Sequence, residues 1–167
     1  MPSDKTDEEL GEILAGWDFL IVDDNPSALS ILRSMLMMRG MKEPLEALDG
    51  AAAMELVKQN TIDCIITDIR MEPMNGAEFV RWVRHSNEVA NPNVRIIAMS
   101  AYRDVREIGD IKREGANGFI GKPASAQMLE KVLKAVADHD GGFVEADTAG
   151  GLRRTVDAAA DGGESNG

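Results

Sequence analysis

Four short, almost continuously apolar runs constrain the fold of this chain more than any other feature of its sequence. They are FLIV at 19–22, CIIT at 64–67, RIIAM at 95–99 and GFIG at 118–121. A strand with one face in water alternates apolar and polar residues, whereas a continuous apolar run is typical of a strand covered on both faces. The runs therefore predict a buried parallel sheet, to which PLEA at 44–47 adds a weaker fifth strand.

Helical patterns fill the segments between these runs. The plainest is a stripe with i, i+3, i+4, i+7 spacing, formed by Leu129, Val132, Leu133 and Val136. Strands that alternate with helices predict an α/β doubly wound fold. Helices are expected on both faces of the sheet, because crossovers between parallel strands are right-handed.

The two ends of the chain differ in composition from its centre. The chain has 167 residues, a size typical of one domain, and a net charge of −11. Residues 1–16 are an acidic extension, in which Thr6 and Glu9 form a capping-box pattern that predicts a short helix. Residues 17–139 are the predicted domain. Residues 140–167 are acidic and rich in Gly, Ala and Asp, and are expected to be a flexible tail.

Composition also excludes several classes of function. Acidic ends argue against binding to DNA or RNA, which basic segments provide. No apolar run reaches the roughly 20 residues of a membrane span, and the acidic start lacks the pattern of a secretion signal. The single cysteine, Cys64, rules out an internal disulfide and fits a reducing compartment. We expect a cytoplasmic protein that binds neither nucleic acid nor membranes.

Reactive side chains follow each of the four strong strands. The first strand ends in Asp23 and Asp24, the second in Asp68, the third in Ser100 and the fourth in Lys122. Ligands of doubly wound sheets bind at the carboxyl ends of the strands. Three carboxylates, a hydroxyl and an ammonium are therefore expected to meet at one edge of the sheet.

These groups together suit the binding of a divalent cation and a phosphoryl group. Neighbouring carboxylates repel one another unless a cation shares them. Mg²⁺ is the expected cation because it prefers oxygen ligands, including phosphate oxygens, and Mn²⁺ is expected to substitute for it. A carboxylate can attack phosphorus to form an aspartyl-phosphate, and Lys122 and Ser100 can bind the phosphoryl oxygens.

Each of these residues also has an ordinary structural interpretation. An acid pair after a strand is usually a turn or a helix cap, and Asp24 or Asn25 is well placed to cap a helix beginning at Pro26. Lys-Pro after a strand is usually a turn, and serine there is usually a cap. Their joint occurrence at four strand ends favours the phosphoryl site over these interpretations.

The same motifs resemble the receiver domain of response regulators in two-component signalling, in particular the chemotaxis regulators. The resemblance covers residues 17–139 and consists of FLIVDD (19–24), CIITDIRMEPMNG (64–76), RIIAMSA (95–101) and GFIGKP (118–123). It implies a flavodoxin-like sheet of five parallel strands in the order 2-1-3-4-5. It also implies phosphorylation by a histidine kinase or a phosphotransfer protein.

The resemblance implies roles for the acidic residues. Asp68 would be the phosphorylated nucleophile. Asp23 and Asp24 would bind Mg²⁺ together with Asp68 and the backbone carbonyl of Arg70. Gly76 would close the loop that follows Asp68.

Roles follow in the same way for the other strand ends. Lys122 would contact the phosphoryl group and precede a cis bond to Pro123. Ser100 would sense the phosphoryl group, and Phe119 would be the switch aromatic that rotates inward when Ser100 moves. Tyr102 lies where a side chain influences the access of water, so it is expected to slow hydrolysis of the phosphate.

Two positions depart from the pattern common in the family. Glu72 stands where proline is common, with Pro73 after it, which leaves the shape of the loop over residues 71–75 open. Phe119 replaces the common tyrosine, so a hydroxyl contact is lost while an aromatic switch is retained.

The resemblance implies signalling through proteins. A downstream partner is expected to read the face formed by residues 104–138, and the chain is expected to be a monomer or weak dimer. It would be no enzyme beyond catalysing its own phosphorylation and slow dephosphorylation. The alternative is an interaction module of the same fold that works without phosphorylation. A phosphatase is disfavoured, because it needs an acid at position 70, where this chain has Arg70.

Overall fold

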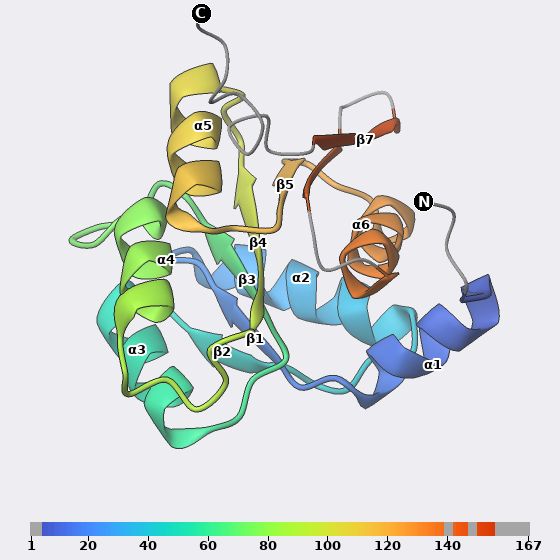
Figure 1. Cartoon of the computed structure of the whole chain (residues 1–167), viewed down its shortest axis with the longest axis horizontal. Coiled ribbons are helices and arrows are strands. Elements are labelled where there is room, and N and C mark those ends of the chain that lie inside the picture. The colour runs from blue at the N-terminus through green and yellow to red at the C-terminus, as the bar shows by residue number, and fades with distance from the viewer. Residues whose placement is uncertain (1–4, 139–141, 147–149, 156–167) are drawn as a thin grey trace, which may run out of the picture.

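A parallel sheet forms the centre of the computed structural model, which describes residues 5–138, 142–146 and 150–155 (Figure 1). Its first five strands run parallel in the order β2-β1-β3-β4-β5. They are β1 (Phe19–Val22), β2 (Leu45–Ala47), β3 (Cys64–Asp68), β4 (Arg95–Ser100) and β5 (Gly118–Gly121). The doubly wound fold and the order of these five strands are confirmed.

Helices cover both faces of this sheet (Figure 1). Those over one face are α3 (Gly50–Gln59), α4 (Gly76–His85) and α5 (Val105–Glu114), and those over the other are α1 (Asp7–Gly16), α2 (Pro26–Met38) and α6 (Ala126–Asp138). Successive strand residues alternate between the two hydrophobic clusters, so that Phe19 packs with α2 and α6 while Leu20 packs with α3 and α4. This alternation explains the continuously apolar strands. None of the described helices combines the length and apolarity that crossing a membrane requires.

The predicted helix near the N-terminus is confirmed as α1. The Thr6 hydroxyl accepts the Glu9 N–H at 3.0 Å, and the Glu9 carboxylate accepts the Thr6 N–H at 2.8 Å. Leu14 is buried in the cluster that also contains the core residues of α6, and Lys134 of α6 lies 3.0 Å from Asp7. Helix α1 therefore packs onto the domain.

Two further strands extend the sheet where the sequence predicts a flexible tail. β6 (Phe143–Ala146) pairs parallel with β5, and β7 (Leu152–Thr155) pairs antiparallel with β6. In the described part of the chain the sheet has seven strands rather than five, and the prediction of flexibility over 140–167 is wrong for these two segments. Of that tail, residues 140–141, 147–149 and 156–167 lie outside the described part of the chain.

The sequence did not predict these strands, because they are only four residues long and lie among Gly, Ala and Asp. Phe143, Val144 and Ala146 are nevertheless buried. Gly118 of β5 permits the close pairing, since a Cβ at this position would lie 2.9 Å from the Val144 carbonyl oxygen. A strand with little sequence signal is thus stabilised by its tertiary neighbours.

The added strands change the face expected to meet a partner. That face, residues 104–138, includes the outer edge of β5, and in the structure this edge is paired with β6 (Figure 1). Partner binding by residues 104–138 stays a prediction, but β5 is an interior strand of the described sheet, with β6 and β7 beyond it.

Candidate phosphorylation and metal site

Parallel pairing of β1 with β3 brings the three predicted acids together. Val22 lies opposite Thr67 in the register, so the residues that follow them, Asp23 and Asp68, are neighbours. One carboxylate oxygen from each of Asp23, Asp24 and Asp68 lies within 4.8 Å of the other two. Three hard oxygen donors at this spacing fit a divalent cation such as Mg²⁺.

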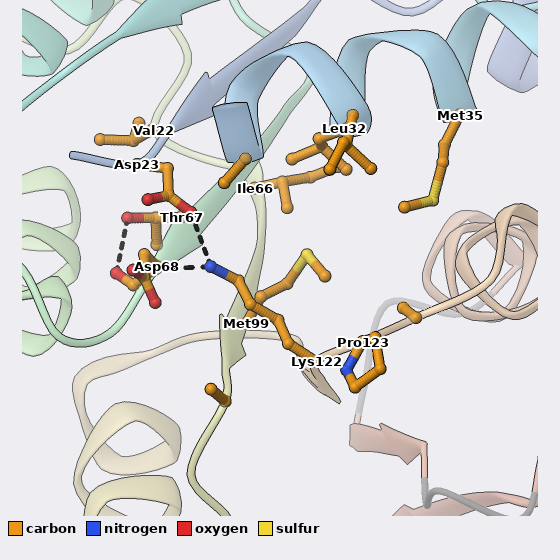
Figure 2. Close-up of a pocket in the computed structure, with 14 residues that line it drawn as sticks. Val22, Asp23, Leu32, Met35, Ile66, Thr67, Asp68, Met99, Lys122 and Pro123 are labelled. Atoms are coloured by element: carbon orange, nitrogen blue, oxygen red, sulfur yellow. Dashed lines mark hydrogen bonds and ion pairs between the residues drawn. The ribbon is translucent and has the colours of Figure 1, made fainter. Parts of the chain in front are cut away.

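Lys122 completes the cluster from the loop after β5. Its Nζ lies 2.6 Å from Asp23 Oδ2 and 3.6 Å from Asp68 Oδ2, and Figure 2 shows the ammonium placed between the two carboxylates. The Lys122–Pro123 bond is cis, as the resemblance implies. Asp23 is almost fully buried, so this pairing offsets the cost of burying its charge.

The environment of Asp68 disfavours its ionised form. Burial raises the pKa of this carboxyl, the Lys122 ammonium lowers it, and the charges of Asp23 and Asp24 raise it again. Asp68 Oδ1 also accepts the N–H of Ile69 at 2.9 Å, which holds the side chain in place and favours the charged form. A cation among the three acids would relieve the remaining repulsion.

Binding of Mg²⁺ is therefore expected to raise the thermal unfolding midpoint of the chain, because the three acids lie together only in the folded state. Replacing the exposed Asp24 by Asn should weaken Mg²⁺ binding about ten-fold or more. The affinity can be measured from the midpoint as a function of Mg²⁺ concentration. Glu72→Gln removes an exposed acid outside the cluster and should leave the affinity unchanged; equal losses in both variants would count against the site.

Ser100 ends β4 beside this cluster and is buried. Its hydroxyl accepts the backbone N–H of Tyr102 at 3.1 Å, and its carbonyl accepts the N–H of Lys122 at 2.8 Å. In the register Asp68 pairs with Met99, the residue before Ser100. Ser100 thus links the loop that leads into α5 to the segment that carries Lys122.

Arg70 and Tyr102 form a contact that the sequence did not predict. The Arg70 guanidinium lies 3.8 Å from the centre of the Tyr102 ring, and its Nε donates to both carboxylate oxygens of Glu107 at 3.1 Å. Such a stack ties the loop after β3 to the loop after β4. The role of the Arg70 carbonyl as a metal ligand stays a prediction.

Phe119 differs from its expected starting position. The sequence predicts an aromatic that rotates inward upon phosphorylation, but this side chain is already fully buried in the cluster with α3, α4 and α5. The Arg103 guanidinium lies 5.8 Å from the centre of its ring. The sequence shows an aromatic at position 119, whereas its burial and its contact with Arg103 are seen only in the folded chain.

The structure defines the shape of the loop over residues 71–75, which could not be predicted because Glu72 replaces the common proline. The Glu72–Pro73 bond is cis, and α4 begins with a reciprocal capping box between Asn75 and Glu78. The N–H of Gly76 donates to the Ile69 carbonyl at 2.7 Å. This contact closes the loop onto the strand that carries the acceptor, as predicted for Gly76.

Thr67 is a supporting residue that the sequence analysis missed. It is fully buried, and its hydroxyl donates to the Asp68 carbonyl at 3.0 Å. The signal was a single hydroxyl inside the apolar run at 64–67. Its hydrogen bond restrains the backbone at Asp68 (Figure 2).

A largely apolar hollow of about 380 Å³ opens beside Asp68 and Lys122 (Figure 2). Its other walls come mainly from α2 and from the start of the segment after β5, and include Ala28, Ile31, Leu32, Met35, Pro123 and Ala124. One side of Asp68 therefore faces an apolar surface of α2.

Fold and site together define an α/β protein with three carboxylates and a lysine gathered at the carboxyl edge of its sheet. The sequence matches the family of the response regulator receiver domain over residues 19–134, most of the chain. This chain belongs to that family, whose members are signalling modules of two-component systems.

Three similar proteins illustrate the match. The chemotaxis protein CheY of Pseudomonas aeruginosa is 29% identical over 123 residues, which cover 74% of this chain and 98% of that protein. The transcriptional regulatory protein ZraR of Klebsiella oxytoca is 30% identical over 122 residues, or 73% of this chain, but the match spans only 26% of ZraR. The structure of the CheX–CheY–BeF3–Mg complex from Borrelia burgdorferi is 26% identical with a TM-score of 0.66, covering 72% of this chain and 88% of that one.

Proposed function

We propose that this chain acts as a single-domain response regulator that takes a phosphoryl group on Asp68 from a histidine kinase or a phosphotransfer protein. The observation that carries the proposal is the convergence of three carboxylates with Lys122 at the carboxyl edge of the sheet. The similarity to CheY over 98% of that protein's length supports it.

The proposed reaction is a displacement at phosphorus. An oxygen of Asp68 attacks the phosphoryl group of a phosphohistidine, the new O–P bond forms, and the P–N bond breaks as the histidine nitrogen leaves with its electron pair. Mg²⁺, or Mn²⁺ in its place, would be held by Asp23, Asp24, Asp68 and the Arg70 carbonyl and would neutralise charge on the phosphoryl oxygens.

Lys122 and Ser100 are proposed to stabilise the negative charge on the phosphoryl oxygens that the metal does not neutralise. The ammonium that now lies against two carboxylates is in reach of a phosphoryl group on Asp68. The Ser100 hydroxyl is proposed to turn from Tyr102 toward a phosphoryl oxygen. The chain would catalyse only its own phosphorylation and slow dephosphorylation.

Output is proposed to pass to a protein partner rather than to nucleic acid or a membrane, with the chain in the cytoplasm as a monomer or weak dimer. The partner would read the region of residues 104–138, in which the loop after Ser100 leads into α5. The apolar surface of α2 beside Asp68 supports an approach of the phosphodonor protein from that side.

Labelling with acetyl phosphate tests the proposal without the natural donor. One phosphoryl group per chain is expected in the presence of Mg²⁺ or Mn²⁺, and none after chelation. The label should be released by hydroxylamine, which cleaves acyl phosphates. A chain that takes no label under these conditions, yet binds its partner, would instead be the phosphorylation-independent interaction module.

Tyr102→Ala is expected to speed loss of the phosphate roughly two- to ten-fold. The Tyr102 ring stacks with Arg70 beside the acceptor loop, so its removal should open the site to water. The release of phosphate can be followed after removal of excess acetyl phosphate. Tyr102→Phe keeps the ring and should match the wild type; a rate no faster in Tyr102→Ala than in Tyr102→Phe would contradict the role of the ring.

A further inference from the structure

We infer that the hairpin formed by β6 and β7 is a displaceable cover of the β5 edge, and that phosphorylation of Asp68 loosens it by drawing Arg103 away from Glu145. Its release would expose the β5 edge between α5 and α6 as the surface that a partner reads. This inference rests on the proposed function, because it assigns the output of the same site.

The hairpin covers an edge that is otherwise suited to binding an extended segment. β6 pairs parallel with β5, with Val144 opposite Gly118 and Ala146 opposite Ile120. An unpaired strand edge is a template for further strand addition. The hairpin thus occupies the place that a partner's strand would take.

The contacts that attach the hairpin to the edge of β5 are few enough to open readily. Each of its strands has four residues, and among the described strands β7 pairs with β6 alone. Short elements at the edge of a sheet lie at the low end of local stability, so they open without unfolding the domain. The buried Phe143, Val144 and Ala146 hold it closed in the absence of a signal.

Glu145 connects this hairpin to the loop that follows Ser100. One of its oxygens lies 3.1 Å from Arg103 of the β4–α5 loop, and the other lies 3.2 Å from Arg153 of β7. Arg103 also donates to the Ala146 carbonyl at 3.3 Å. The Glu145 side chain is only 13% exposed, so losing Arg103 leaves a largely buried carboxylate that is still paired, among the described residues, with the mostly exposed Arg153.

A short path joins Arg103 to the phosphorylation site. The Ser100 hydroxyl accepts the N–H of Tyr102, the residue immediately before Arg103. Turning this hydroxyl toward a phosphoryl oxygen removes that hydrogen bond and draws the loop toward Asp68. Phe119 is already buried, with Arg103 over its ring; the moving part is therefore Arg103.

Coupling of this kind acts in both directions. If phosphorylation loosens the hairpin, then weakening the hairpin's link to the loop must favour the phosphorylated conformation. Arg103→Gln is therefore expected to tighten binding of beryllofluoride with Mg²⁺, a mimic of the phosphoryl group, by roughly two- to five-fold, the range of a partly exposed ion pair.

Hydrogen exchange on the full chain tests the inference directly. In the wild type, beryllofluoride with Mg²⁺ should speed exchange of the backbone amides in residues 143–146, including the Val144 N–H that donates to the Asn117 carbonyl at 3.0 Å. In Arg103→Gln these amides should exchange faster before any addition and respond little to beryllofluoride. Arg153→Gln removes the other partner of Glu145 without touching the loop, and should keep the wild-type response.

The possible outcomes separate this inference from the proposed function. Beryllofluoride that binds while leaving exchange of residues 143–146 unchanged or slower overturns the inference alone. The same holds if Arg103→Gln binds beryllofluoride no more tightly than Arg153→Gln does. If the wild type binds no beryllofluoride and takes no label from acetyl phosphate, the proposed function and the inference both fail.

Discussion

Asp68→Asn is expected to reduce labelling by acetyl phosphate at least about a hundred-fold, the cost of removing one principal group from such a site. The amide is a poor nucleophile and cannot share a divalent cation as a carboxylate does. The incorporated phosphoryl group can be counted by intact-protein mass measurement. Asp110→Asn, which changes an exposed carboxylate on α5, should label like the wild type, and persistent labelling of Asp68→Asn would place the acceptor elsewhere.

The stability of the same variant provides an independent check on the site. Because burial raises the pKa of Asp68 above its ordinary value, the folded state holds the proton more tightly than the unfolded state does. Folding is therefore favoured below the ordinary pKa of an aspartate, and this contribution is lost as the pH rises through the raised value. At neutral pH and without metal, Asp68→Asn should unfold at a higher temperature than the wild type.

Gly76→Ala is expected to lower the free energy of unfolding by about 2–3 kcal/mol, the cost of forcing an extra carbon into a packed position. A Cβ at residue 76 would lie 2.8 Å from the Ile69 Cα and still closer to the Asp68 carbonyl oxygen. Since both neighbours are backbone, the helix start or the acceptor strand must shift. Denaturant unfolding measures the loss, and labelling by acetyl phosphate should fall with it.

A second glycine in a helix supplies the control. A Cβ on Gly109, within α5, would meet only Arg113 at an ordinary 3.6 Å. Gly109→Ala should therefore be neutral or stabilise the fold by up to about 1 kcal/mol, as alanine does inside helices. If the two alanine variants were equally stable, the close approach at Gly76 would not matter.

The central strands could be predicted because both of their faces are buried, which leaves a continuous apolar run in the sequence. The gathering of the acids with Lys122 could be predicted because these residues, like Ser100, end those strands or follow them directly. β6 has almost the same character, but Glu145 interrupts it, and the group that makes this acid acceptable is Arg103, far away in the chain. Pairings of that kind, like the stack of Arg70 on Tyr102, arise only when the chain has folded.

Helix α6 is partly covered by α1 and β7, which limits the proteins that can bind to it. Helix α1 packs against it through Leu14 and the ion pair of Asp7 with Lys134, and Arg154 of β7 donates to the Ala135 carbonyl at 2.7 Å. While the hairpin is closed, a protein that grips α6 where α1 and β7 pack would collide with them. Steric exclusion of this kind increases the specificity of signalling, because proteins of other pathways cannot bind even though the phosphorylation site itself is unchanged.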